Sequence, residues 1–77
     1  MTAPGPQPRR KVVRALERCY GWHLAREGGN HTIYEKDGEE TPIPVPRHKE
    51  ITVFVLKSIA RTLGVSLADF LETLRNC

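Results

Sequence analysis

The apolar residues of this chain change their spacing twice, and the change determines the order of its secondary structure. They recur at helical spacing near the N-terminus, alternate with a period of two in the middle, and return to helical spacing from Thr52 onward. A chain of 77 residues hides only about 60% of its unfolded surface, so these elements must share one small core. The sequence predicts an α+β domain in the order helix, three antiparallel strands, helix and short helix, with the helices on one face of the sheet.

Three helices are predicted, each with an apolar stripe and with residues suited to its ends. Gly21 ends the first helix, Thr52 lies near the start of the second, Gly64 ends the second, and Ser66 begins a short third one. Propensity alone would also allow a strand over residues 51–56. The stripes consist of Val12, Ala15, Leu16 and Cys19, then Leu56, Ile59, Ala60 and Leu63, and finally Leu67, Phe70, Leu71 and Leu74.

Three strands are predicted at residues 22–26, 31–36 and 39–45, with turns at 27–30 and at Asp37-Gly38. Prolines at positions 42, 44 and 46 put the missing amide donors of the last strand on one side. That strand must therefore lie at an edge of the sheet, with Ile43 and Val45 facing the helices. The opposite face, with Thr32, Tyr34 and the prolines, is expected to be open.

The first eight residues are rich in proline and glycine and are predicted to form a disordered lead-in to a single domain over residues 9–77. They lack the apolar centre of an export signal, and no apolar run is long enough to cross a bilayer. The expected location is the cytoplasm, without a membrane partner. Cys19 and Cys77 are expected to be free thiols, because neither is in a C-x-x-C pair and a disulfide-stapled small protein would need more cysteines.

Several enzyme classes are set aside by motifs that the chain lacks. It has no phosphate-binding glycine-rich loop, no nucleophile elbow, and no spacing of cysteine and histidine suited to zinc. No metal and no other cofactor is therefore expected. The net charge of +3 suits an anionic partner, but ordinary solubilising charge would give the same value.

His31 is the candidate catalytic residue, because it follows the turn Gly28-Gly29-Asn30 at the start of a strand. Glycines leave room for another backbone to approach. A free imidazole, with a pKa of about 6.5, can take the proton of a ribose 2′-hydroxyl or, once protonated, give one to the departing 5′-oxygen. From the residues alone, an exposed histidine without a catalytic role is the more common alternative.

Other polar residues are candidates for supporting roles. His48 would be a second acid or base, an exposed Tyr34 would stack on a base, and His23 is assigned a structural role. The cations that would line a track for phosphates are Arg26, Arg47, Lys49 and Lys57. Acidic residues are interleaved with them, so a mixed solvated surface is an equal alternative.

Several short motifs occur in a characteristic order along the chain. A helix ending in Tyr20-Gly21-Trp22 precedes Arg26-Glu27-Gly28-Gly29-Asn30-His31, then Ile43-Pro44-Val45-Pro46-Arg47-His48, Leu56-Lys57-Ser58-Ile59, Leu63-Gly64-Val65-Ser66 and Phe70-Leu71. No single motif is specific. Their order and separation, from Lys11 through Leu71, resemble the HicA-like (YcfA-like) small toxins of bacterial type II toxin–antitoxin pairs.

The resemblance implies a double-stranded-RNA-binding-domain-like fold and metal-independent endoribonuclease action on messenger RNA. It implies that the histidine after the turn, His31, is catalytic, and that Gly29 and Asn30 of the turn support it. A HicB-type antitoxin that covers this histidine is implied as the protein partner. Gly29 stands where the family commonly has serine, and Pro42 and Pro44 make the third strand unusually rich in proline.

Two alternatives remain open. One is a passive binder of double-stranded RNA with the same fold but without catalysis. The other is a helix-turn-helix DNA-binding protein, suggested by the segment Ala60–Ser66 between two helices. This second alternative is weaker, because the next helix offers Asp69 and Glu72, which would repel phosphate, and because that fold does not require three strands.

Overall fold

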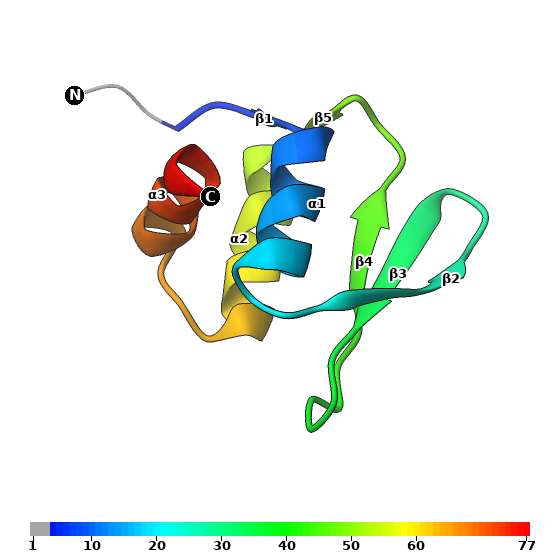
Figure 1. Cartoon of the computed structure of the whole chain (residues 1–77). Coiled ribbons are helices and arrows are strands. Elements are labelled where there is room, and N and C mark those ends of the chain that lie inside the picture. The colour runs from blue at the N-terminus through cyan, green and yellow to red at the C-terminus, as the bar shows by residue number, and fades with distance from the viewer. Residues whose placement is uncertain (1–3) are drawn as a thin grey trace.

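The helices group on one side of the molecule and the main sheet lies on the other (Figure 1). In this computed structural model, which describes residues 4–77, the sheet has the antiparallel order β2-β3-β4. The predicted α+β class and double-stranded-RNA-binding-domain-like arrangement are confirmed. The helices are α1 (Arg9–Arg18), α2 (Val53–Leu63) and α3 (Leu67–Asn76), and the strands of the sheet are β2 (His23–Glu27), β3 (His31–Glu35) and β4 (Ile43–Pro46).

Local signals in the sequence explain where α2 and α3 begin and where α2 ends. The Thr52 hydroxyl accepts a hydrogen bond of 3.4 Å from the Val55 amide, and the Ser66 hydroxyl accepts one of 3.0 Å from the Asp69 amide. Gly64 follows α2 in the left-handed conformation, with φ of 78°, which glycine adopts without a steric penalty. The predicted caps of these two helices are therefore confirmed.

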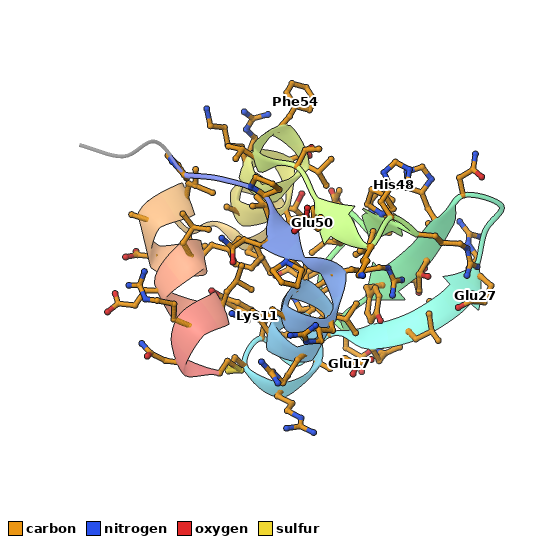
Figure 2. All side chains as sticks on the ribbon, turned by 90° about the horizontal axis from the view of Figure 1, so that it is seen from above. Lys11, Glu17, Glu27, His48, Glu50 and Phe54 are labelled. Carbon is orange, nitrogen blue, oxygen red and sulfur yellow. A yellow bond between two sulfur atoms is a disulfide. The ribbon has the colours of Figure 1, made fainter. Side chains whose placement is uncertain are left out.

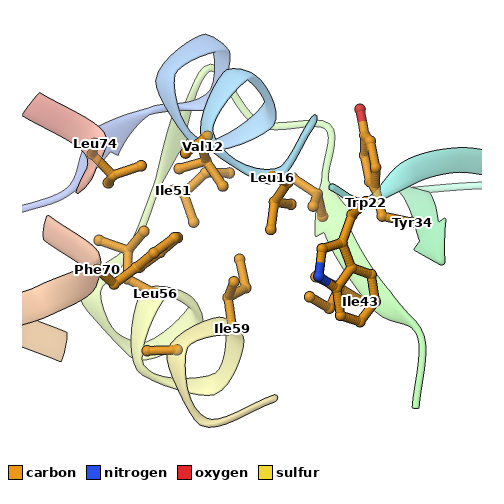
Figure 3. Packing of buried hydrophobic residues seen from close by; sticks show 13 residues of the cluster. Val12, Leu16, Trp22, Tyr34, Ile43, Ile51, Leu56, Ile59, Phe70 and Leu74 are labelled. Atoms are coloured by element: carbon orange, nitrogen blue, oxygen red, sulfur yellow. The ribbon is translucent and has the colours of Figure 1, made fainter. Parts of the chain in front are cut away.

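One cluster of buried residues joins the helices to the sheet (Figure 3). The helices contribute most residues of the predicted stripes, and the sheet contributes side chains from β3 and β4. Of the other stripe residues, Cys19 is exposed, and Leu63, Leu67 and Leu71 are partly buried. This packing covers one face of the sheet, as expected. The buried apolar residues are Val12, Ala15, Leu16, Trp22, Tyr34, Ile43, Val45, Ile51, Leu56, Ile59, Ala60, Phe70 and Leu74.

The prediction that Thr32 and Tyr34 lie on the open face is wrong. Each is only 3% exposed, because Thr32 pairs with Val45 and Tyr34 pairs with Ile43. Residues directly opposite one another in an antiparallel pair share a face, so these side chains point toward the helices. The register instead puts His31 and Ile33 on the open face, opposite Pro46 and Pro44.

The third strand starts later than predicted. Asp37 and Gly38 form the expected turn, closed by a hydrogen bond of 3.0 Å from the Glu39 amide to the Lys36 carbonyl. The chain then remains irregular until Ile43, where β4 begins at the edge of the sheet. The edge position of the proline-bearing strand is confirmed, whereas the strand does not reach back to Glu39.

A second, two-stranded sheet modifies the predicted lead-in. Its strands are β1 (Gln7–Pro8) and β5 (Glu50–Ile51), which pair in antiparallel fashion. The last two residues of the expected disordered segment therefore have regular structure, while Met1 to Ala3 lie outside the described residues. The pairing holds the start of α1 beside the segment that leads into α2 (Figure 1).

The two cysteines form a disulfide, so the prediction of free thiols is wrong. Cys19 follows α1 and is exposed rather than part of the core, and Cys77 follows α3 (Figure 2). The bond connects the C-terminal ends of the two helices, and the cysteines therefore give no support to a cytoplasmic location. Among residues 4–77, no helix has the length and apolar character that a bilayer crossing requires.

Candidate functional site

His31 is the first residue of β3, and its side chain is exposed on the open face of the sheet. Its carbonyl accepts a hydrogen bond of 2.8 Å from the Gly28 amide, which closes the turn between β2 and β3. On its other side His31 pairs with Pro46 in the edge strand. The backbone is thus held from both neighbouring strands while the imidazole is accessible.

Arg26 shares the open face with His31 because β2 contains a bulge. Leu24 pairs with Tyr34 but Arg26 pairs with Ile33, so Ala25 is an extra residue. Without it, alternation along β2 would put Arg26 on the helix-covered face together with Leu24. Arg26 is the diagonal neighbour of His31. Diagonal neighbours in a sheet typically have their Cα atoms about 7–8 Å apart, within reach of a long side chain.

Arg47 holds the turn that precedes His31. Its Nε donates a hydrogen bond of 3.2 Å to the Gly29 carbonyl, and its Nη2 donates one of 3.1 Å to the Gly28 carbonyl. The same Nη2 forms an ion pair with the Glu27 carboxylate, and the Arg47 amide donates to the Asn30 carbonyl over 3.0 Å. Four consecutive turn residues are therefore bound by one arginine.

Arg9 supports the opposite side of His31, a role that the sequence motifs do not indicate. Its Nε donates a hydrogen bond of 2.9 Å to the Pro46 carbonyl, and its Nη2 donates one of 2.8 Å to the hydroxyl of buried Thr32. Pro46 is the residue that pairs with His31, and Thr32 is the residue that follows His31. A cation in the first turn of a helix interacts unfavourably with the helix dipole. In the sequence, this is the indication that the Arg9 side chain has partners outside the helix.

The remaining candidates do not all gather around His31. His48 is exposed and lies two residues after Pro46, the residue that pairs with His31, so it follows the end of β4 that is nearest to His31. Lys57 is exposed on α2 in the helical layer instead. Tyr34, which was expected to stack on a base if exposed, is buried.

Tyr34, on the helix-covered face of the sheet, has a shifted pKa. Burial, followed by the negative charge of Glu17, raises the pKa of Tyr34, and the Arg9 guanidinium opposes this shift. The Tyr34 hydroxyl donates to the Glu17 carboxylate over 3.4 Å. No group of three or more His, Cys, Asp or Glu side chains within residues 4–77 is arranged to hold a metal ion.

A family model described as "HicA toxin of bacterial toxin-antitoxin" matches residues 9–65, which is more than half of the chain. The chain belongs to this HicA toxin family. The match begins at Arg9 and includes every candidate site residue from Arg26 to Lys57. Searches of the curated proteins and of the solved structures found no match.

Membership of the HicA family confirms the resemblance that the motifs indicate. It identifies the protein as a toxin of a toxin–antitoxin system, and such a toxin is paired with an antitoxin. It also disfavours the helix-turn-helix alternative, because the matched range contains the three-stranded sheet that such a protein does not need.

Proposed function

We propose that this HicA-family toxin is an endoribonuclease that cleaves messenger RNA without a metal ion, with His31 as its acid/base. The observation that carries the proposal is the position of His31 on the open face of the sheet, accessible to a large substrate. Family membership supplies the toxin context. The chemistry of an imidazole suits an RNA substrate, because the ribose provides its own nucleophile.

The reaction is an internal transesterification. A base removes the proton of the 2′-hydroxyl, the 2′-oxygen attacks the adjacent phosphorus, and the bond from phosphorus to the 5′-oxygen breaks. An acid protonates the departing 5′-oxygen, so the products carry a 2′,3′-cyclic phosphate and a 5′-hydroxyl. His31 performs one of these proton transfers, and His48, at the same end of the sheet, is the candidate for the other.

We assign substrate binding to the open face of the sheet and to the end of the sheet at which His31 lies. Arg26 is the cation best placed to contact the phosphate backbone beside His31, and the Gly29–Asn30 turn forms the edge of the site. Lys57, on the helical layer, would contact a more distant part of a bound strand. A HicB-type antitoxin that covers this face would block the substrate.

The proposal is tested by induced expression of the parent and of His31→Ala in bacteria, with total RNA examined after induction. We expect growth arrest and RNA cleavage with the parent and neither with His31→Ala. His23→Ala is the matched control, since it removes another exposed imidazole, from the residue of β2 that pairs with Glu35. This control should behave as the parent does.

An alternative outcome would identify a passive binder of double-stranded RNA. In that case the purified protein would bind RNA in a salt-dependent way, and His31→Ala would change neither binding nor RNA integrity. Messenger RNA as substrate implies action in the cytoplasm, where thiols are kept reduced. The assay is therefore run on both the oxidised and the reduced protein.

A further inference from the structure

We propose that Glu27 and Arg47 act as one positioning unit, which fixes the β2–β3 turn and thereby the orientation of His31. The inference rests on the function proposed above. In this proposal Arg47 places the catalytic residue and does not bind phosphate. Glu27, although acidic, then favours cleavage of an anionic substrate.

The contacts of Arg47 account for the geometry of the turn. The Nε and Nη2 of its side chain donate to two backbone carbonyls and one carboxylate, and its backbone amide donates to a third carbonyl. These partners are the side chain of Glu27 and the backbones of Gly28, Gly29 and Asn30, the four residues just before His31 (Figure 2 labels Glu27). A planar guanidinium fork suits this set of acceptors, whereas an ammonium group would not.

The turn needs such support because it is intrinsically flexible. Two adjacent glycines lose more conformational freedom on folding than any other pair, so their conformation must be held by contacts. The Glu27 and Arg47 side chains are 54% and 42% exposed, and an isolated ion pair this exposed contributes little to overall stability. Its effect is therefore local, because a displacement of about 1 Å at a catalytic group costs up to about 100-fold in rate and a smaller displacement costs less.

The direction in which the cleavage rate changes in Glu27→Gln distinguishes a positioning role from a purely electrostatic effect. Removal of a negative charge beside an RNA site should improve binding, so a purely electrostatic view predicts that Glu27→Gln cleaves as well as the parent or better. The positioning role predicts the reverse. We expect kcat to fall about tenfold in Arg47→Ala and by a smaller factor in Glu27→Gln, whose amide oxygen still accepts from Arg47 but carries no charge, with little change in KM in either variant. The double variant should be no worse than Arg47→Ala alone, because Glu27 acts through its contact with Arg47, which Arg47→Ala already lacks.

The control is Glu40→Gln, which removes an exposed carboxylate from the other end of the sheet without touching this turn. It should leave kcat unchanged. For Arg47→Ala, the salt dependence of KM should keep the parent's slope. A smaller slope with an unchanged kcat would identify Arg47 as a phosphate contact and would overturn the positioning role, as would an undiminished kcat in Glu27→Gln.

A second measurement does not depend on RNA cleavage. Backbone NMR order parameters of residues 28–31 should fall in Glu27→Gln and Arg47→Ala and stay at the parent's values in Glu40→Gln. Unchanged order parameters in the two turn variants would reject the positioning unit even if the protein cut no RNA. Conversely, a parent without nuclease activity, combined with reduced order in these variants, would reject the proposed function and retain the structural unit.

Discussion

At the scale of single residues, Tyr34 shows how a buried side chain links the sheet to α1. The residue is 3% exposed, and its hydroxyl donates to the Glu17 carboxylate. Burial and the nearby negative charge both disfavour the phenolate, so the pKa of Tyr34 is raised above its ordinary value of 10.0. The folded state therefore keeps the proton at a pH where the unfolded chain has lost it.

This shift predicts that the protein loses stability in alkaline solution. Below about pH 10 the contribution of Tyr34 is fully present, and it declines as the pH rises from there through the raised pKa of the folded state. In Tyr34→Phe, the free energy of unfolding should be about 1 kcal/mol lower at neutral pH and should decline less steeply above pH 10. Urea denaturation of both proteins at several pH values measures this; parallel curves would contradict it.

The roles of Arg47 and Gly28 are the hardest to predict from the sequence. An arginine next to a histidine suggests phosphate binding, and nothing local indicates that Arg47 folds back over a turn 18 residues away. Similarly, the two glycines are indistinguishable in the sequence. Only the distances show which of them is in close contact with His31.

At the scale of elements, the β2–β3 turn depends on Gly28 more than on Gly29. A Cβ at Gly28 would lie 3.2 Å from the His31 carbonyl oxygen, whereas a Cβ at Gly29 would have nothing within 4 Å. Neither glycine has a positive φ, so the difference between them is steric. The space at Gly29 would accommodate a small side chain such as that of serine.

We therefore expect Gly28→Ala to lower the melting temperature and to shift the backbone of His31. The loss should be on the order of 1 kcal/mol, because the close contact is with backbone and not with a flexible side chain. Gly29→Ala is the matched control and should melt at the parent's temperature or slightly above, since alanine restricts the unfolded chain. Thermal unfolding followed by circular dichroism tests this pair; equal losses would contradict the steric explanation.

The helices were predictable because caps and apolar stripes are local, but the faces of the strands were not. Assigning Thr32 and Tyr34 to a face requires knowing which residues of β4 lie opposite them, and this register is a tertiary property. The bulge at Ala25 is equally invisible in the alternation of β2, yet it determines that Arg26 and His31 share a face. The short pairing of β1 with β5 also depends on contacts between distant segments.

At the scale of the whole molecule, the disulfide joins residues 58 positions apart in sequence. A count of two cysteines without a motif gave no reason to expect it, because the pairing depends on α1 and α3 ending side by side. Other contacts also hold α3: Phe70 and Leu74 are buried, and the Tyr20 hydroxyl donates to the Thr73 hydroxyl over 3.1 Å. The helix should therefore stay docked when the bond is absent.

Cys77→Ser should lower the free energy of unfolding by about 3–4 kcal/mol, since the bond closes a long loop in the unfolded chain. The parent treated with a reductant should show the same loss, and the variant should not respond to the reductant. Guanidinium denaturation of both proteins, with and without reductant, measures the effect. Equal stability of the oxidised and reduced parent would show that the bond does not stabilise the fold.

In the proposed reaction, His31 transfers a proton during RNA cleavage without help from a metal. The most direct measurement is the cleavage rate of purified parent and His31→Ala on an RNA oligonucleotide in EDTA, with the product ends identified by mass spectrometry. We expect 2′,3′-cyclic phosphate ends with the parent and a rate lower by about 10²- to 10⁴-fold in His31→Ala. A His31→Ala variant that cuts as fast as the parent would contradict it.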